Sequence, residues 1–400
     1  MKISSSPDLP DLQKTQNNPQ LSDGLIPLAP DAKALTTAKA SLQLFGKLKH
    51  TIDGDTGEVE DSAAPNEFEC EDLVLHGNLL EQTGCGLSRH EMYVVMMTMK
   101  KLGEDANLGV ATARFFGKVL GTHRDYYIFE TTLQTPPEPL PEKEGEVPPE
   151  AGVGVNAFTY FVCNELGGPF TMLPDVTPGQ IKAARVLKKV MTGNLDAPVS
   201  AYPPFPGREN AFLRTQIARI AHATTLAPSG MFTVDEDSGE VTKAEEFEAL
   251  PADEMISPEN WVHKLPHIKM QGRCEVWKPE EEDEEEEREP TEEEAEEGPE
   301  ALSPAMGDAP VMGSVPWTAV TSSKSGGVKF KVVALRSNLW PGAAAVVSGT
   351  DFANIYVGWA VKNAKFVPVP PPAVAFEFEQ KLIESVDLPP RVVPEAEEEE

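Results

Sequence analysis

The sequence predicts an α+β protein in which helices pack on a mostly antiparallel sheet. Three observations predict this class. Segments 111–120 and 125–133 are rich in β-branched and aromatic residues and flank Gly121–Arg124, a pattern typical of a hairpin. Segments 88–103 and 178–192 carry apolar residues at helical spacing behind a capping residue. Apolar residues make up 40% of the 400-residue chain, which is enough for a sizeable core.

Composition divides the chain into six expected regions. These are a flexible N-terminal arm at 1–32, an N-terminal helical region at 33–110, a central α+β body at 111–279, a disordered acidic insertion at 280–313, C-terminal strands completing the body at 314–380, and an acidic tail at 381–400. Strands are expected on both sides of the acidic run. We therefore favour an insertion within one sheet over a linker between two domains.

The N-terminal helical region contains two expected helices. Segment 32–49 has helical composition, with apolar residues near one stripe. Ser88 and Glu91 form a capping-box pattern, in which the serine side chain accepts from the N3 amide and the glutamate reaches back to the serine N–H. Gly103 is expected to end this second helix.

The body continues with a strand at 153–163 and a helix at 178–192. Thr177 is placed to cap that helix, Pro178 suits its first position, and Gly193 is expected to end it. The apolar residues of this helix face one way, and lysines and an arginine surround them.

Proline then shapes the chain. Tyr202–Gly207 reads Tyr-Pro-Pro-Phe-Pro-Gly, which predicts a stiff extended corner because each proline fixes its φ angle and restrains its predecessor. A helix is expected at 209–224, and a hairpin at 232–241. Further strands are expected at 273–277, 328–336 and 355–361.

The formal net charge of −31 is localised. Glu280–Glu300 holds fifteen acids and one arginine, and Glu395–Glu400 holds five acids, so the rest carries 45 acids against 33 bases, a net of −12. Such runs are typical of solvated spacers, and attraction of basic partners is the alternative. Without a basic stripe, a nucleic-acid partner is not expected.

Targeting and membrane signals are equally scarce. The first residues lack an apolar signal-peptide region, and no stretch approaches 18 apolar residues, so we expect neither secretion nor a membrane span. Four widely spaced cysteines fit a reducing, intracellular compartment.

Catalytic and cofactor motifs are missing from the sequence. It contains no GxxxxGK[ST], no GxGxxG and no GxSxG, so we expect no cofactor and no enzymatic activity. A Ser/His/Asp triad assembled in space stays open. Cys163 followed by Asn164 is a conceivable nucleophile, but a thiol within an aromatic-rich strand favours a core position.

Two metal patterns fail on closer inspection. His263 and His267 have i, i+4 spacing, but Pro266 lies between them and Cys274 is the only other nearby ligand, so we favour satisfied histidines over a metal site. Segment 235–246 resembles a calcium loop, but Glu240 occupies the position that requires glycine, which favours a hairpin. We therefore expect no metal.

Aromatic residues are the stronger functional candidates, since they bury much area at interfaces for little loss of entropy. A core position is the alternative for each. The candidate structural or interface anchors are Tyr126, Tyr127, Tyr202, Phe205, Trp261, Trp340 and Trp359. The basic face of the 178–192 helix is expected to be solvated, with docking of an acidic partner as the alternative.

Several segments closely resemble the radial spoke head protein 4/6 family of motile cilia and flagella. The quoted matches are RFFGKVLGTHRDYYIFE at 114–130, GVNAFTYFVCNELGGPFTMLPDVTPGQIKAAR at 154–185, TGNLDAPVSAYPPFPGRENAFLRTQIARI at 192–220, ENWVHKLPHIKMQGRCEVW at 259–277, RSNLWPGAAAV at 336–346 and NIYVGWAVKN at 354–363. The resemblance spans residues 33–380, and the combination of these motifs is very specific.

This resemblance implies a non-enzymatic subunit of the radial spoke head in the 9+2 axoneme. Such a subunit would help assemble the head and transmit mechanical signals from the central pair to the dynein arms. The implied partners are a paralogous 4/6 subunit, radial spoke head protein 9, MORN-repeat spoke head proteins and, transiently, the central pair projections. A soluble acidic binding or assembly protein, or an enzyme with an unrecognised site, is the alternative function.

Overall fold

The computed structural model describes residues 66–141, 146–235, 241–278, 291–322 and 331–365. All of them belong to one compact unit. The expected arm at 1–32, the expected helix at 32–49, most of the glutamate run and the acidic tail lie outside the described residues. Among the residues that the structure describes, no helix is long and apolar enough to cross a membrane.

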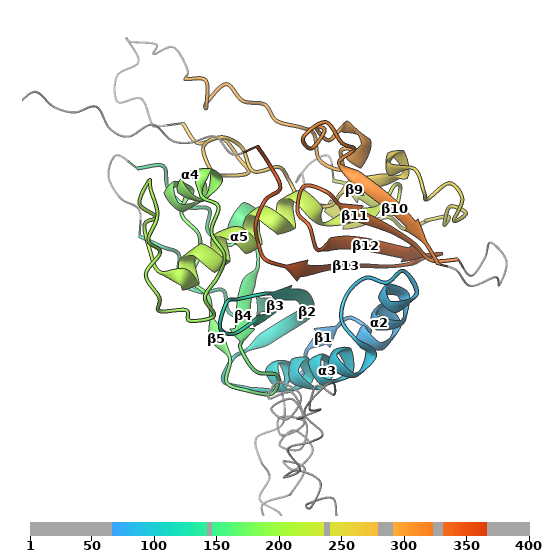
Figure 1. Cartoon of the computed structure of the whole chain (residues 1–400), viewed down its shortest axis with the longest axis horizontal. Helices are drawn as coiled ribbons and strands as arrows, with labels where there is room; N and C mark the ends of the chain where they lie inside the picture. The colour runs from blue at the N-terminus through green and yellow to red at the C-terminus, as the bar shows by residue number, and fades with distance from the viewer. Residues whose placement is uncertain (1–65, 142–145, 236–240, 279–290, 323–330, 366–400) are drawn as a thin grey trace, which may run out of the picture. The chain divides into compact units, whose positions relative to one another are not determined.

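A nine-stranded sheet organises the described part of the chain (Figure 1). Its strands, in chain order, are β1 (Glu69–Cys70), β2 (Val110–Val119), β3 (Tyr126–Leu133), β4 (Thr159–Cys163), β5 (Thr171–Met172), β10 (Trp317–Thr321), β11 (Val333–Ser337), β12 (Ala343–Ser348) and β13 (Asp351–Gly358). Their order across the sheet is β10-β11-β12-β13-β2-β3-β4-β5, with β1 beside β2.

Most neighbouring strands are antiparallel, so the predicted α+β class with a mostly antiparallel sheet is confirmed. The exceptions are β1 and β13, which both run parallel to β2. The pairing of β13 with β2 joins the strands that follow the glutamate run to those that precede it. Gly117 makes this close approach possible, because its φ is +147° and a Cβ there would collide with the Tyr356 carbonyl oxygen.

Two helices precede β2: α2 (Leu73–Gln82) and α3 (Arg89–Gly103). The Asp72 carboxylate caps α2 by accepting from the N–H groups of Val74 and Leu75, both at 3.0 Å. The prediction of a helix at 88–103 is confirmed, with the Ser88 hydroxyl accepting from Glu91 N–H at 3.2 Å. The reciprocal half of the capping box does not form.

The Glu91 side chain is drawn elsewhere by tertiary contacts. Its Oε1 accepts hydrogen bonds from Lys118 Nζ at 2.8 Å and from the Tyr127 hydroxyl at 2.7 Å. A charge-assisted bond to a largely buried lysine outweighs a local bond to a helix terminus that water reaches. Glu91 therefore ties α3 to the sheet instead of closing its own helix.

Two more helices, α4 (Pro178–Val186) and α5 (Glu209–Thr224), follow β5. The prediction of 209–224 is confirmed, and Thr177 and Gln180 form the capping box of α4. The expected extent of α4 to residue 192 is wrong. Its helix ends at Val186 because the following residues pair with the β2–β3 turn: Met191 bridges Gly121, and His123 N–H donates to the Thr192 carbonyl at 2.9 Å.

Smaller elements complete the described chain. They are β6 (Leu226–Pro228) paired with β9 (Trp261–His263), β7 (Phe232–Val234) paired with β8 (Val241–Lys243), and the short 3-10 helices η2 (Gly154–Asn156), η3 (Pro258–Asn260) and η4 (Ala305–Gly307). The β7–β8 pair confirms the expected hairpin. The expected strand at 273–277 is wrong, because Gln271 bonds both the N–H and the carbonyl of Trp277 and closes a loop there.

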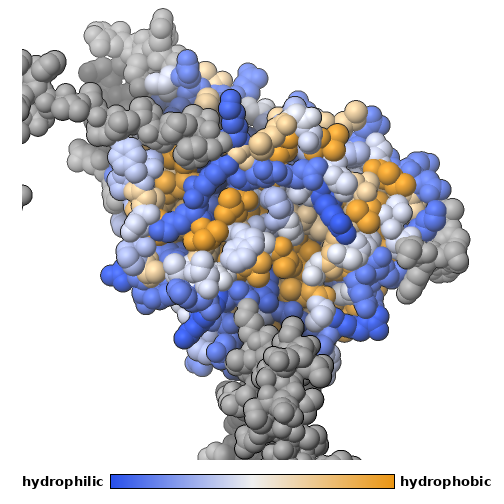
Figure 2. Space-filling model, in the orientation of Figure 1, coloured by the Kyte–Doolittle hydropathy of each residue, from blue (hydrophilic) through white to orange (hydrophobic). Residues whose placement is uncertain are grey.

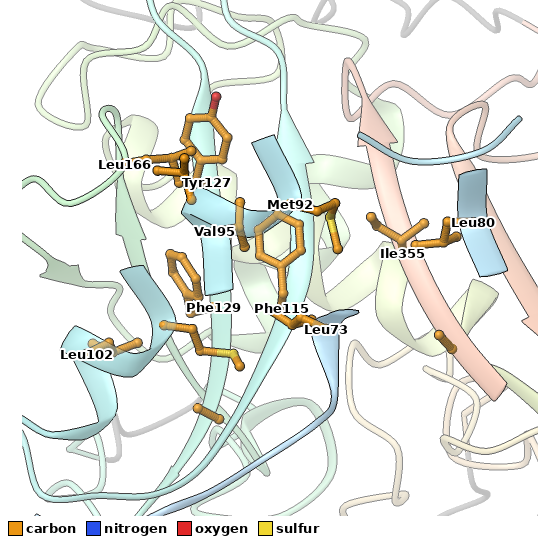
Figure 3. Close-up of a cluster of buried hydrophobic side chains, with 14 of the residues drawn as sticks. Leu73, Leu80, Met92, Val95, Leu102, Phe115, Tyr127, Phe129, Leu166 and Ile355 are labelled. Atoms are coloured by element: carbon orange, nitrogen blue, oxygen red, sulfur yellow. The ribbon is translucent and has the colours of Figure 1, made fainter. Parts of the chain in front are cut away.

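The sheet is covered on both faces. Successive side chains of its central strands point alternately to one face and to the other. Phe115, Tyr127 and Phe129 pack with α2 and α3 on one face, as Figure 3 shows. Tyr126 and Ile128 pack with α4 and α5 on the other face. A third cluster lies between β10–β12 and the β6–β9 pair and surrounds the fully buried Trp261. The helices thus fix the sheet from both sides.

Residues 291–313 differ from the expected disordered insertion. Ala305 is fully buried, Val311 is 5% exposed, and Pro304 bridges Val262 of β9. Ala305, which follows the last glutamates, packs into the third cluster, and the adjoining Pro304 pairs with β9. The sequence pattern hid this because acids and prolines dominate its composition.

Candidate assembly surface and the framework beneath it

The seven aromatic candidates separate into buried and exposed groups. Tyr202 is 56% exposed and Trp359 is 48% exposed. The other five are no more than 9% exposed: Tyr126, Tyr127, Phe205, Trp261 and Trp340. The buried five act within the fold, so only the two exposed rings can meet another molecule with much of their surface.

Trp359 stands on a fixed piece of backbone immediately after β13. Gly358 before it accepts from Leu120 N–H at 2.8 Å. Ala360 after it is fully buried; its N–H donates to the Tyr356 hydroxyl at 2.8 Å, and its carbonyl accepts from the Gln216 side chain at 3.2 Å. An exposed aromatic ring on a rigid backbone binds with little ordering cost, which suits an interface anchor.

Tyr202 lies in a long loop between α4 and α5 that is also held at several points. Phe205 packs against Phe212 of α5 with ring centroids 5.1 Å apart. Lys189 Nζ donates to the Ser200 carbonyl at 3.0 Å, and Glu209 N–H donates to the Ala197 carbonyl at 3.0 Å. The proline-rich corner predicted from the sequence therefore displays one tyrosine and buries one phenylalanine.

Glu209 is the anchor of this loop, although the sequence analysis did not single it out. It opens α5 and is 2% exposed. Its carboxylate accepts from the Tyr126 hydroxyl, from the Thr192 hydroxyl and N–H, and from Gly193 N–H, all at 2.8–2.9 Å. The N-terminus of a helix also favours a negative charge. A glutamate in a first helical turn usually faces water, so no sequence signal marks it as buried.

A buried ion pair crosses the centre of the sheet. Arg114 binds Glu130 through two parallel bonds of 2.8 and 2.7 Å, and the Tyr160 hydroxyl donates to Glu130 at 2.8 Å. Burial opposes the charge on Glu130, but Arg114 outweighs it and holds the pKa of that carboxyl below its ordinary value. The Arg214 guanidinium lies 4.5 Å from the Tyr160 ring centroid and is 1% exposed. The network joins β2, β3, β4 and α5.

The two buried thiols, Cys163 and Cys274, lack the environment of a nucleophile. Burial raises the pKa of Cys163 to about 12. Cys274 Sγ lies 3.7 Å from His222 Nδ1, but that nitrogen also contacts the Pro266 carbonyl at 2.7 Å, which requires it to donate. Burial lowers the pKa of His222 to about 4 and raises that of Cys274. This thiol and imidazole are both neutral near pH 7 and cannot exchange a proton directly.

The two spaced histidines do not form a metal pair. His263 Nε2 lies 3.0 Å from Asp308 Oδ1, and Trp317 Nε1 donates to the other oxygen of Asp308 at 2.6 Å. No group of three potential ligands for a metal ion occurs within the residues that the structure describes. Both histidines instead line a cavity of about 440 Å³.

Apolar side chains also reach the surface near η4 and β10. Met306 is 59% exposed, Met312 is 69% exposed and Val315 is 62% exposed. Figure 2 shows one face of the molecule, where apolar residues form small patches bordered by hydrophilic side chains. Small patches of this kind are normal on the surface of a folded protein and do not by themselves mark an interface.

Comparisons with known proteins agree on one family. A family model described as "Radial spokehead-like protein" matches residues 9–146 and 134–400. The chain is 43% identical over 398 residues to flagellar radial spoke protein 4 of Chlamydomonas reinhardtii, covering 94% of this chain and 85% of the relative. It is 37% identical over 388 residues to human radial spoke head protein 6 homolog A, covering 81% of this chain and 54% of the relative.

Human radial spoke head protein 4 homolog A is 34% identical over 383 residues, with 83% of this chain and 53% of the relative covered. The chain therefore spans about half the length of the two human relatives and most of the algal one.

Proposed function

The chain belongs to the radial spokehead-like protein family, and on that premise we propose that it is a structural subunit of the radial spoke head, located in the axoneme of cilia and flagella. The relatives are named as radial spoke and radial spoke head proteins. A subunit of this kind acts through shape, contact area and stiffness, so its important residues are those that hold the fold and those that meet neighbours.

One observation supports this function best: two large aromatic rings, Tyr202 and Trp359, are exposed on backbone segments that hydrogen bonds hold in place. We assign them the role of interface anchors toward other spoke head components. The paralogous 4/6 subunit, radial spoke head protein 9, MORN-repeat proteins and, transiently, the central pair projections are the partners we propose.

Transmission of mechanical signals from the central pair to the dynein arms is also part of the proposal. Its support is the construction of the sheet: β13 and β2 come from distant parts of the chain and lie side by side. The buried Arg114–Glu130 pair adds a further tie within the sheet. A load on one segment would therefore be carried by the whole sheet.

The interface role is tested with Trp359→Ala and Tyr202→Ala, introduced into ciliated cells that lack the native protein. Met172→Ala is the matched control, since Met172 is 50% exposed on the edge strand β5. Loss of one anchor is expected to cost about 2 kcal/mol, or roughly 30-fold in affinity. Each anchor variant should fall in amount on salt-washed axonemes, while the control should stay at the wild-type level.

The melting temperature of each purified variant keeps this test specific. We expect it to stay within about 2 °C of wild type, because exposed side chains contribute little to stability. Wild-type amounts of both anchor variants on axonemes would refute the assignment of Tyr202 and Trp359. Absence of the unaltered protein from axonemes would refute the structural function itself.

We further infer that the chain is not an enzyme. The support is the chemistry of Cys163, Cys274 and His222: burial raises the pKa of both thiols and lowers that of the imidazole, so all three favour their neutral forms. Incubation of the purified protein with small-molecule libraries, followed by mass spectrometry, should reveal no turnover. A product that disappears with Cys274→Ser would overturn this inference.

A further inference from the structure

A cleft of about 360 Å³ lies between α4, the C-terminal half of α5 and the loop that follows β9. We call it the basic cleft, and its charged or titratable lining residues are Arg185, Arg219, His222, His267, Glu296 and Lys362. Pockets of about 300–1,000 Å³ are large enough to hold small ligands or peptide side chains. In a strongly acidic protein, this cleft gathers three cations around one carboxylate.

The two arginines of the basic cleft are bonded only to neutral acceptors. Arg185 donates to the carbonyls of Ile268, Lys269 and Met270 at 2.6–3.0 Å. Arg219 Nη1 donates to the Ala184 carbonyl at 2.6 Å and to Gln216 Oε1 at 2.7 Å. These bonds hold both guanidinium groups in place without a hydrogen bond to a carboxylate, and of the two only Arg185 is influenced by nearby glutamates.

Lys362 completes the cluster. It is partly buried, and its ammonium has neither a hydrogen-bond nor an ion-pair partner among the residues described by the structure. Burial and the nearby Arg219 and Arg185 lower the pKa of Lys362. Burial and Arg185 also lower the pKa of Arg219 to about 10. A carboxylate placed between Lys362 and Arg219 would relieve this repulsion.

The chain itself shows which chemistry this surface accepts. Glu296 lines the cleft, and its Oε2 accepts from Met270 N–H at 2.5 Å. Glu293, three residues earlier in the chain, forms an ion pair with Lys182 of α4, in which Oε2 and Nζ are 2.5 Å apart. Both carboxylates come from one acidic segment that lies against the basic face of α4. Glu296 opposes the effect of burial on Arg185 and His267, but no second carboxylate lines the described part of the cleft.

We propose that the basic cleft is a carboxylate-binding site that takes an acidic peptide segment of a partner protein, with Lys362 and Arg219 as its main contacts. The proposal adds a site to the chain beyond the aromatic anchors and does not depend on them. Charge complementarity selects an acidic partner, because three cations face one carboxylate. The negative net charge of the chain repels an acidic partner. At 0.15 M salt, however, ions screen much of the repulsion between charges that are more than about 8 Å apart.

The test uses a fluorescein-labelled octaglutamate peptide and the full-length protein, with binding followed by fluorescence anisotropy in 0.15 M NaCl. Lys362→Gln should weaken binding about tenfold, since a charged hydrogen bond contributes about 1.5–3 kcal/mol. Lys362→Glu should weaken it further, because it adds repulsion. Lys243→Glu makes the same charge change at an exposed position on β8 and should change the affinity less than about twofold.

A second protein, in which the eight acids Glu280–Glu287 are all replaced by glutamine, separates the possible occupants. The proposal expects the peptide to bind wild type and this variant alike, within about threefold. Binding to the glutamine variant alone would assign the cleft to the chain's own glutamate run and overturn the partner assignment. Binding to neither protein, or equal loss with Lys243→Glu and Lys362→Glu, would overturn the site. Unchanged melting temperatures verify that the variants are folded.

Discussion

The buried carboxylate of Glu209 is the most direct point at which to test how the fold positions the candidate surface. It joins α5 to residues 192–193 and to Tyr126 of β3. Both of its oxygens accept hydrogen bonds, and every group that faces them is a donor. In Glu209→Gln, the amide nitrogen must face one of these donors, and the negative charge at the helix N-terminus is lost.

The size of the effect follows from these contacts. The Thr192 hydroxyl is able to turn and accept from the new amide, so the least costly arrangement keeps Oε1 in place. The remaining bonds change from charged to neutral acceptors, and the helix terminus loses about 0.5–1 kcal/mol. Glutamine is neutral, so the variant no longer bears the free-energy cost of burying a charge. This gain offsets part of the lost hydrogen-bond energy. We therefore expect Glu209→Gln to lower the free energy of unfolding by about 2 kcal/mol.

The assay is a double-mutant cycle with Tyr126→Phe, measured by urea unfolding and by melting temperature. Tyr126→Phe should cost about 1.5–2 kcal/mol in the wild-type background but about 1 kcal/mol less when Glu209 is already glutamine. At roughly 2–4 °C per kcal/mol, Glu209→Gln alone should lower the melting temperature by about 4–8 °C.

Additive effects in this cycle would show that the Tyr126–Glu209 bond carries no interaction energy and would refute the reasoning. A second readout is incorporation into axonemes at a temperature where the variant is folded. The loop that carries Tyr202 is anchored through Glu209, so Glu209→Gln should reduce incorporation, while Met172→Ala should not.

Three further predictions concern the sheet and the pH dependence of the protein's stability. Gly117→Ala should destabilise the protein by about 3 kcal/mol or more in urea unfolding, because the new methyl group collides with the Tyr356 carbonyl oxygen; a stable variant would contradict the parallel β13–β2 pairing. Glu130→Gln should cost about 3–5 kcal/mol, because it leaves the Arg114 charge buried without a counter-ion, and a loss below about 1 kcal/mol would refute this. The pKa of His222 is about 4 in the folded chain and about 6.5 in an unfolded one, so the unfolded state binds a proton first as the pH falls. The free energy of unfolding should therefore decrease by about 2–3 kcal/mol from pH 6.5 to pH 4, and His222→Gln should remove most of that slope; an unchanged slope would assign the acid sensitivity to other groups.

Local signals in the sequence were enough for elements whose ends are marked by caps and turn residues. Ser88 and Gly103 bound α3, and Gly121–Arg124 separates two strands, because a helix terminus needs an acceptor for its N–H groups and a hairpin needs a short polar turn. The α4 helix shows the limit of this reasoning. Residues 187–192 keep a helical pattern of apolar residues. Their hydrogen bonds to the β2–β3 turn and to Glu209 stabilise the chain more than another turn of helix would.

The sequence by itself determined the α+β class, the family and the pattern of caps and turns, since these depend on short-range chemistry and on motifs many residues long. The tertiary structure alone decided which aromatics are exposed, where β13 inserts, and that Glu209 is buried. It also brought Arg185, Arg219 and Lys362 to one cleft. The reason is physical: burial and charge clustering depend on contacts between residues tens to hundreds of positions apart, and no local pattern records which of those contacts form.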